Sequence, residues 1–399
     1  NLKRRMEWKI TNIGSLCDRV CSGGTPKSTN NAYYNGNIPW LNTKEVNFNR
    51  IYDTEKNITQ LGLENSSAKW ISENSVIVAM YGATAGKVAI TKIPITTNQA
   101  CCNLSINSEI ADYNFVYYFL CSKFYELSSL ANGGAQQNLN AQIIKDFPIK
   151  IPVNLSDQKK IAGILSALDS KIENNNKINA NLEAQAQALF KSWFVDFTPF
   201  KDQPFVDSEL GPIPQGWKVG KINEFVDVIY GAPYKSKLFN TQKEGLPLIR
   251  IRDLKTCSPQ FYTKELLPNT ELVNYGDVVA GMDAEFTPHI WLGETGLLNQ
   301  RVCKFKPHTG ISPLYSMLMI KPKLEFAQNY KVGTTVSHLG KSDIDKFIII
   351  VPPLDIVKEV SSIFDAVLNE QINLAKENQR LAALRDTLLP KLMSGEIKL

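Results

Sequence analysis

The chain has 399 residues, a length that predicts two to three domains at about 150 residues each. Hydrophobic residues make up 43% and charged residues 21% of it, and no segment reaches the roughly 18 consecutive apolar residues that a membrane span needs. The net charge of +5 permits a nucleic-acid partner but is too small to require one.

The beginning of the chain and its cysteines favour the cytoplasm. Residues 1–9 are charged and lack the apolar core of a secretory signal. The seven cysteines include no Cys-x-x-Cys pair and no nearby histidine cluster, so we expect reduced thiols and neither a disulfide framework nor a zinc site.

Residues 1–154 are predicted to form a mixed α/β domain, because short β-type segments alternate with Gly, Pro and Asn. The apolar run 38–46 ends in a polar corner, and a second apolar run, 75–80, is followed by an aromatic residue. Amide, hydroxyl and ammonium groups at strand ends suit hydrogen bonding to base edges. The candidate DNA contacts from these two places are Asn42, Thr43, Lys44 and Tyr81.

The segment 82–88 pairs glycines with a lysine, as a phosphate-binding loop does. It has three residues between its glycines where a Walker loop has four, and Val88 stands where a Ser or Thr would hold Mg²⁺. We therefore predict no nucleotide site here. Lys27 is a candidate phosphate contact, although it could equally be a solvated surface lysine, and Lys87 is a candidate DNA contact. Gln136 and Gln137, in a glycine-containing stretch, are candidate base or phosphate contacts.

Residues 155–197 are predicted to form one long helix whose apolar and amide positions recur at steps of four and three, the seam of a coiled coil. The seam positions are Ile161, Leu165, Leu168, Ile172, Asn175, Asn179, Leu182, Ala186, Leu189 and Trp193. From Ser156 to Phe194 such a helix would be roughly 55 to 60 Å long, which favours a spacer. An ordinary core helix is the alternative, but the Asn-rich middle would make a poor core.

Residues 198–214 form a proline-rich linker in which both helix and strand are discouraged. The chain then repeats itself, by 209 positions from Trp8 to Trp217 and by 200 positions from Leu139 to Leu339. The matching segments are 7–28 with 216–236, 38–46 with 246–254, 75–80 with 277–282, 97–100 with 298–301, and 133–152 with 333–352. Residues 215–353 are therefore predicted to be a second copy of the first domain.

The two copies differ in the polar groups that they offer at matching positions. Arginine pairs with guanine edges and acids accept from cytosine, so different residues on one scaffold predict two different readers. The candidate DNA contacts in the second copy are Lys235, Arg250, Arg252, Asp283, His289 and Arg301. For the shared pair Asn98-Gln99 and Asn299-Gln300 we favour a structural role, because shared residues cannot explain different specificities.

Residues 354–393 repeat the long helix, and residues 394–399 form a short tail. This seam contains Asn378 at the position that matches Asn179. If the two helices pair antiparallel, these two asparagines could meet near the helix midpoints and fix the register. The residues predicted to pair the helices are Asn179, Leu182, Leu189, Asn378, Leu381 and Leu388.

No catalytic, cofactor or metal site is predicted on this chain. It has no Gly-x-Gly-x-x-Gly after a strand and no Asn-Pro-Pro-Tyr or Asp-Pro-Pro-Tyr quartet of the kind that holds a flipped base. Asp253-Leu254-Lys255 is only a fragment of a nuclease pattern. All three histidines lie in the second copy, so no histidine site is duplicated.

In this ordered set of motifs the chain resembles the specificity subunits of type I restriction-modification enzymes, over almost its whole length. The residues that carry the resemblance are Gly23 to Ser28, Ile38 to Trp40, Tyr81 to Val88, Asn138 to Asn140, Leu189 to Phe197 and Leu384 to Ile397. The second copy departs from the pattern, because residues 284–289 lack the glycines and lysine of 82–87, which puts DNA contact by that loop in doubt.

The resemblance implies an α+β fold of two tandem α/β target-recognition domains separated by two long antiparallel coiled-coil helices, related by a pseudo-two-fold internal repeat. Each domain would read one half of a split double-stranded DNA site, without catalysis on this chain. The implied partners are two modification subunits that use S-adenosylmethionine to methylate adenine and, in the nuclease form, two ATP-driven restriction subunits. S-adenosylmethionine, ATP and Mg²⁺ would then belong to those partners.

Two alternatives from other classes stay open at this point. The chain could be a self-contained DNA methyltransferase or nuclease whose active site has no recognised motif. It could also be a coiled-coil scaffold that joins other proteins.

Overall fold

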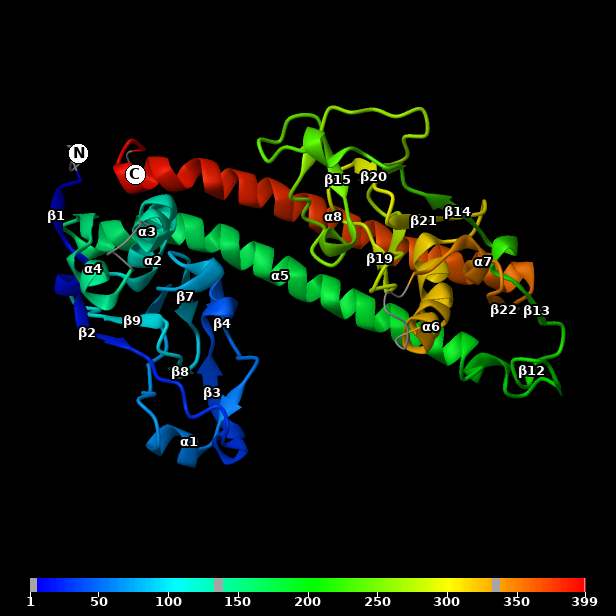
Figure 1. Cartoon of the computed structure of the whole chain (residues 1–399), viewed down its shortest axis with the longest axis horizontal. Helices are drawn as coiled ribbons and strands as arrows, with labels where there is room; N and C mark the ends of the chain where they lie inside the picture. The colour runs from blue at the N-terminus through cyan, green and yellow to red at the C-terminus, as the bar shows by residue number, and fades with distance from the viewer. Residues whose placement is uncertain (1–5, 133–138, 332–337, 398) are drawn as a thin grey trace. The chain divides into compact units, whose positions relative to one another are not determined.

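The computed structural model describes residues 6–132, 139–331, 338–397 and 399. The chain divides into two compact units, one made of residues 1–171 with 381–399 and the other of residues 172–380. Each unit contains one α/β module, whose strands run from Trp8 to Pro152 in the first unit and from Lys218 to Val351 in the second, together with parts of two long helices (Figure 1). This arrangement confirms the predicted α/β class with an internal repeat.

The first module contains a five-stranded sheet, a three-stranded sheet and a strand pair. The sheet orders are β2-β9-β6-β7-β4, β5-β3-β8 and β1-β10. The strands are β1 (Trp8–Asn12), β2 (Cys17–Ser22), β3 (Tyr34–Leu41), β4 (Asn49–Ile51), β5 (Asn57–Ile58), β6 (Val76–Ala79), β7 (Val88–Thr91), β8 (Thr96–Thr97), β9 (Cys101–Ile106) and β10 (Pro148–Pro152). The helices are α1 (Gln60–Glu64), α2 (Tyr113–Ser122), α3 (Phe124–Asn132) and α4 (Ala141–Asp146).

The second module repeats this plan with sheets β14-β21-β18-β19, β16-β15-β20-β17 and β13-β22. Its strands are β13 (Lys218–Lys221), β14 (Val226–Tyr230), β15 (Leu246–Ile249), β16 (Tyr262–Thr263), β17 (Leu272–Val273), β18 (Val278–Gly281), β19 (Pro288–Ile290), β20 (Gly296–Leu298), β21 (Val302–Pro307) and β22 (Ile348–Val351). Its helices are α6 (Pro313–Lys331) and α7 (Lys341–Ile344).

Strand pairing shows that the repeat is structural and not only a likeness of motifs. In each module the first and last strands pair antiparallel, Trp8 opposite Pro152 and Lys218 opposite Val351. Each module also contains a parallel pair between a strand that follows its first glycine turn and a short strand later in the chain. These pairs are β3 with β8 and β15 with β20.

The predicted linker is more ordered than its prolines suggest. Helix α5 (Leu155–Phe194) ends shortly before Phe197, whose φ of 51° lies in the left-handed region that does not continue a helix. The linker then contains a 3-10 turn, Thr198–Phe200, and the antiparallel two-residue strands β11 (Phe205–Val206) and β12 (Ile213–Pro214). The prediction that strand would be discouraged here is wrong, because two-residue strands tolerate proline at their ends.

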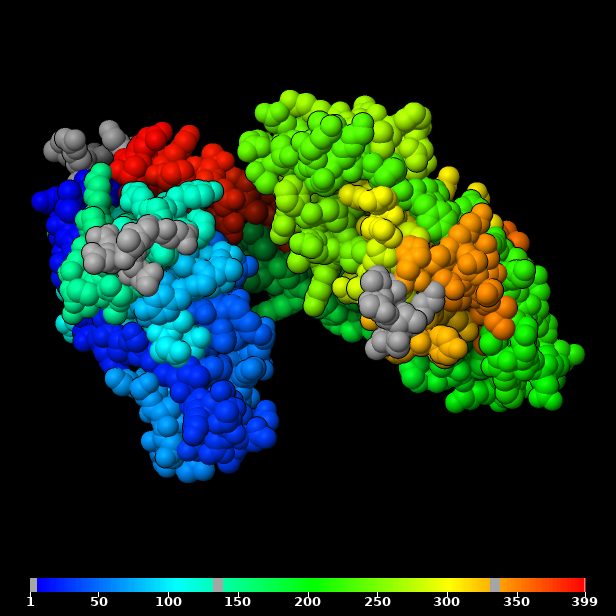
Figure 2. Space-filling model, in the orientation of Figure 1, coloured from blue at the N-terminus to red at the C-terminus, as the bar shows by residue number. Residues whose placement is uncertain are grey.

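The core of the first unit is completed by the last turns of α8 (Leu354–Ser394). Leu392 and Met393 are buried in one cluster with Ile161 and Leu165 of α5 and with the strands and α2 of the first module. Lys150 Nζ donates to the carbonyl of Ser394 at 2.9 Å. Figure 2 shows the red end of the chain packed directly against the blue and cyan first module.

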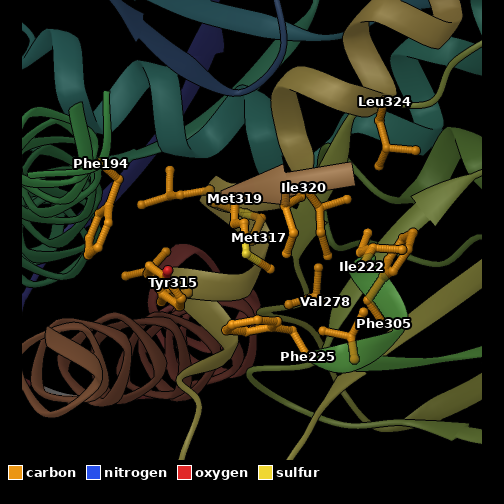
Figure 3. Packing of buried hydrophobic residues seen from close by; sticks show 14 of the residues in the cluster. Phe194, Ile222, Phe225, Val278, Phe305, Tyr315, Met317, Met319, Ile320 and Leu324 are labelled. Carbon is orange, nitrogen blue, oxygen red and sulfur yellow. The ribbon is translucent and has the colours of Figure 1, made fainter. Parts of the chain in front are cut away.

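The core of the second unit is completed in the same way by the end of α5. Phe194 packs on Tyr315 of α6 with ring centroids 5.1 Å apart, and Tyr315 packs on Phe364 of α8 at 6.1 Å. In Figure 3, Phe194 and Tyr315 lie beside the cluster formed by Met317, Ile320 and Val278. Each module is therefore closed by a helix end that comes from the other repeat.

Within each unit the two long helices lie antiparallel. In the first unit Arg385 Nη1 binds Asp169 Oδ1 at 2.8 Å, and Tyr118 donates to the other oxygen of Asp169 at 2.6 Å. In the second unit Asn175 Nδ2 donates to Asn378 Oδ1 at 2.9 Å and to Glu377 Oε2 at 2.7 Å. From the first pair to the second, the residue number rises from 169 to 175 on α5 and falls from 385 to 378 on α8, as it must in antiparallel helices.

The predicted seam lies along the contact between the two long helices, but the pairing of asparagines near the helix midpoints differs from the expectation. Leu182, Leu189, Leu381 and Leu388 are half-buried. Asn378 binds Asn175 and Asn176, not Asn179, so the pair that we expected is displaced by one turn. In the observed pairing the amide of the buried Asn175 donates to two acceptors, Asn378 Oδ1 and Glu377 Oε2. The buried Asn179 Oδ1 has no hydrogen-bond partner among the described residues.

Among the described residues no helix is long and apolar enough to cross a membrane. The cysteines are free thiols, and burial raises the pKa of Cys17 and of Cys102 to about 12, so these two thiols stay protonated at neutral pH.

The closure of the first module by α8 predicts that Leu392→Ala destabilises a module more than 200 residues away in sequence. Leu392 is 1% exposed, so its truncation should cost about 2 to 5 kcal/mol of unfolding free energy. Peptide-level hydrogen exchange should then speed up in β2, β6 and β9. Leu384→Ala is the matched control, since Leu384 is 47% exposed on the same helix. Unchanged exchange in these strands for Leu392→Ala would show that α8 does not support the module.

Candidate nucleic-acid interface

The predicted contact residues of the first module gather where β3 and β8 end. These strands run parallel, with Leu41 opposite Thr97, so the residues that follow both strands meet at one edge. The backbone N–H of Asn98 donates to the carbonyl of Leu41 at 3.0 Å. The structure thus places Asn42, Thr43 and Lys44 beside the Asn98-Gln99 turn.

Asn42 and Glu45 cap the short 3-10 turn Thr43–Glu45 that follows β3. The side chain of Asn42 accepts from the backbone of Lys44 at 3.2 Å, and Glu45 accepts from the backbone of Asn42 at 2.9 Å. Reciprocal bonds of this kind satisfy N–H groups that a turn start would leave unpaired. Asn42 therefore holds the backbone of the turn, whereas Lys44 is exposed and pairs with Glu55, whose hydrogen bond raises the pKa of Lys44.

The loop after β6 lies on this turn. Thr84 Oγ1 donates to the carbonyl of Thr43 at 2.8 Å, so the segment Gly82–Thr84 is fixed against the capped turn. Tyr81 is exposed at the start of that loop. Lys87 Nζ donates to Asn47 Oδ1 at 2.8 Å and lies 5.9 Å from the ring centre of Phe48. The glycine-lysine loop thus presents side chains at the strand-end edge.

In both modules the backbone at the shared Asn-Gln turn lies close to the backbone of a glycine earlier in the chain. A Cβ on Gly23 would lie 2.2 Å from the carbonyl oxygen of Thr97, and one on Gly231 would lie 2.1 Å from that of Asn299. In the second module the N–H of Gln300 donates to the carbonyl of Ala232 at 3.0 Å. These contacts support the structural role that we favoured for the shared pair.

The same edge in the second module is built around a buried carboxylate. Asp253, which is 1% exposed, accepts from the backbone N–H of Arg250 at 3.1 Å and from its Nε at 3.3 Å. The guanidinium of Arg250 lies 4.3 Å from the ring centre of Phe261, and its Nη2 is buried. Arg250 therefore occupies the capping position of Asn42, while Arg252 is exposed at the end of the turn.

Asp283, Arg301 and His338 form a charged cluster at the same edge. Asp283 Oδ2 lies 3.2 Å from Arg301 Nε, and Asp283 Oδ1 lies 2.7 Å from His338 Nδ1. The backbone N–H of Met282 donates to the carbonyl of Arg301 at 2.9 Å, which holds the two loops together.

The remaining predicted residues lie in four different settings. Lys27 is exposed in the loop before β3, and Lys235 is exposed with its Nζ 3.9 Å from Glu265. His289 lies within β19 opposite Val279, half-buried, and not at the strand-end edge. Gln136 and Gln137 lie outside the described residues.

Sequence reasoning missed His338, although the repeat contained the signal. His338 lies 200 positions after Asn138, the end of the stretch from which Gln136 and Gln137 were chosen. In the described part of the chain no group of three or more His, Cys, Asp or Glu side chains is arranged to hold a metal ion. The arrangement presents hydrogen-bond donors and acceptors on an open edge, which suits recognition of a surface.

Comparisons with known proteins agree on one family. A family model described as the type I restriction modification DNA specificity domain matches residues 6–184 and again residues 214–384. The type I restriction enzyme MjaIX specificity subunit of Methanocaldococcus jannaschii is 30% identical, over 98% of this chain and 94% of its own length. The HindI specificity subunit of Haemophilus influenzae is 23% identical, over 98% of this chain and 100% of its own length.

A solved structure shows the same fold. The crystal structure of the type I restriction-modification S subunit from M. genitalium aligns with a TM-score of 0.57 at 17% sequence identity. The alignment covers 98% of this chain and 97% of that one. The two separate matches of the family model also confirm the predicted duplication.

The half-buried position of His289 predicts an acid-sensitive second module. Burial lowers the pKa of His289, although Glu285 and Glu183 oppose the shift, so the unfolded chain takes up the proton more readily than the folded one. Stability from this group is present above the ordinary pKa near 6.5 and is lost as the pH falls through the lower folded value. Thermal unfolding followed by tryptophan fluorescence between pH 7.5 and 5 should show His289→Gln to be less pH-dependent than the natural chain.

His308→Gln controls for the loss of an imidazole, since the side chain of His308 is 39% exposed and its Nε2 lies 3.3 Å from Asp227 Oδ1. One titrating group changes the slope by at most about 1.4 kcal/mol per pH unit. Identical slopes for His289→Gln and the natural chain would contradict the assignment.

Proposed function

Because the chain belongs to the family of type I restriction-modification DNA specificity subunits, we propose that each of its modules reads one half of a split DNA target. As a member of this family the chain recognises DNA sequence within a restriction-modification complex, and catalysis lies in partner subunits. We further propose that the pairing of α5 with α8 fixes the number of base pairs between the two halves.

The observation that carries the proposal is one scaffold with two sets of exposed side chains. In both modules a capped turn after one parallel strand meets an Asn-Gln turn after the other. The exposed position of the capped turn holds Lys44 in one module and Arg252 in the other. A capped turn shared by both modules, with different exposed groups, is what two readers of different half-sites require.

The predicted contacts then divide into three roles. Asn42 and Arg250 hold the turns and position their neighbours, with Thr43 fixed through its carbonyl. Exposed groups at the edge are assigned to base readout, and lysines around it are assigned to phosphates, which set the register on the duplex but carry no sequence information. The base-reading group comprises Lys44, Tyr81, Arg252 and Arg301, and the phosphate group comprises Lys27, Lys87 and Lys235.

We propose two copies of the modification subunit as partners, because the duplication offers two equivalent surfaces. The first unit has a cavity of about 410 Å³ between α2, α3 and the end of α8, lined in part by Tyr125 and Leu389. The second unit has one of about 310 Å³ between α6 and the end of α5, lined in part by Met319 and Phe190. Corresponding helices line part of both cavities, although Asp169, Arg385 and Asp386 line only the first and residues of the linker and β22 line only the second.

Cofactor chemistry is assigned to those partners. S-adenosylmethionine would serve the modification subunits, and ATP and Mg²⁺ would serve the restriction subunits where these are present, two per complex. Since DNA is the shared substrate, we place the assembly in the cytoplasm.

The proposal predicts a two-part site with a fixed gap. The chain, purified with its modification partner, should select such sites from random DNA pools, because each module carries its own reading edge. The chain alone, incubated with DNA, Mg²⁺ and S-adenosylmethionine, should neither methylate nor cleave. Selection of one continuous site, or turnover by the chain alone, would favour the enzyme alternative, and complex binding without sequence preference would favour a scaffold.

A further inference from the structure

The charged cluster of the second module uses both oxygens of Asp283 inside the protein. Oδ1 binds His338 Nδ1 at 2.7 Å and Oδ2 lies 3.2 Å from Arg301 Nε, with Arg301 Nη1 3.5 Å from Oδ1. The Asp283 side chain is 23% exposed and that of Arg301 is 57% exposed. The acid is therefore occupied, while the arginine that it holds faces outward.

Backbone bonds fix the carboxylate on both sides. The N–H of Met282 donates to Arg301 at 2.9 Å, and the N–H of Leu339 donates to Met282 at 2.8 Å. Asp283 and His338 are also paired as an isolated antiparallel bridge. Because three loops meet at this carboxylate, it cannot turn toward a base without breaking contacts on both sides.

Resting on the function proposed above, we infer that Arg301 reads a guanine in the half-site of the second module and that Asp283 is its positioning residue. A guanidinium is planar and offers two parallel N–H groups, which match the O6 and N7 acceptors of guanine in the major groove. The carboxylate contacts Nε and, through one contact at 3.5 Å, Nη1; the second N–H of Nη1 and the N–H of Nη2 parallel to it have no protein partner in the described part of the chain. An arginine held in this way loses less side-chain freedom on binding.

The first module cannot form this cluster. Tyr81 stands at the position of Asp283 and Ala100 at that of Arg301, so neither the acid nor the guanidinium is present. Arg301 is therefore one of the residues in which the two modules differ, and its substitution should affect only one half of the target.

The test compares variants in complex with the modification subunits, by sequencing the sites that become methylated in a random DNA library. Arg301→Ala should reduce the preference for guanine at one position by roughly 5- to 150-fold and leave the other half-site unchanged. Arg301→Lys should not restore that preference, because an ammonium lacks the planar fork. Asp283→Asn should weaken the preference at the same position by a smaller factor.

Glu244→Gln is the matched control, since Glu244 pairs with Lys264 before the start of β15, the strand whose far end carries the reading turn. It should change no base preference. Unchanged base preferences in Arg301→Ala would overturn the assignment while leaving the proposed function intact. A uniform loss of methylation in Asp283→Asn, without a change in preference, would overturn the positioning role. A natural complex that shows no two-part site would instead contradict the proposed function itself.

Discussion

The antiparallel contact of α5 with α8 is the constraint on which the rest of the structure depends. Each helix begins in its own repeat and ends in the core of the other, through Leu392 in one direction and Phe194 in the other. Since neither module closes its core with its own repeat alone, the duplicated halves are tied together by burial of apolar surface. Polar contacts between the helices, such as that of Asp169 with Arg385, favour this one alignment of the helices, because a partly buried charge is destabilising without its partner.

This constraint separates the parts of each module that must stay fixed from those that can vary. Close backbone approaches at Gly23 and Gly231, and the capped turns at Asn42 and Arg250, hold the edge in one geometry. Substitution of the exposed residues around that geometry changes the chemistry of the edge with little effect on the core. A family of DNA-recognition subunits built on this plan can diversify its targets while it keeps one way of assembling.

The sequence predicted the duplication, the fold class and the long helices because these depend on order and periodicity, which a single chain carries. The sequence did not predict features that depend on contacts between individual side chains in the folded chain. The spacing of Asn179 and Asn378 could not reveal a displacement of one turn, since the side-chain hydrogen bonds of the buried Asn175 show which residue faces Asn378 only in the folded chain. Arg250 stays a predicted DNA contact, and residue spacing could not reveal that its guanidinium also contacts Asp253 and Phe261. The contact of His338 with Asp283 depends on the fold, so the sequence did not predict His338 as part of the edge.

The most direct measurement of the central claim is an exchange of residues 1–154 for the matching module of a relative, with α5 and α8 kept so that Leu392 still closes the core. The account predicts that the methylated target changes in one half only, with the other half and the gap retained. A target altered in both halves, or in neither, from a chain that still assembles with its modification partner, would contradict the division of reading between two modules.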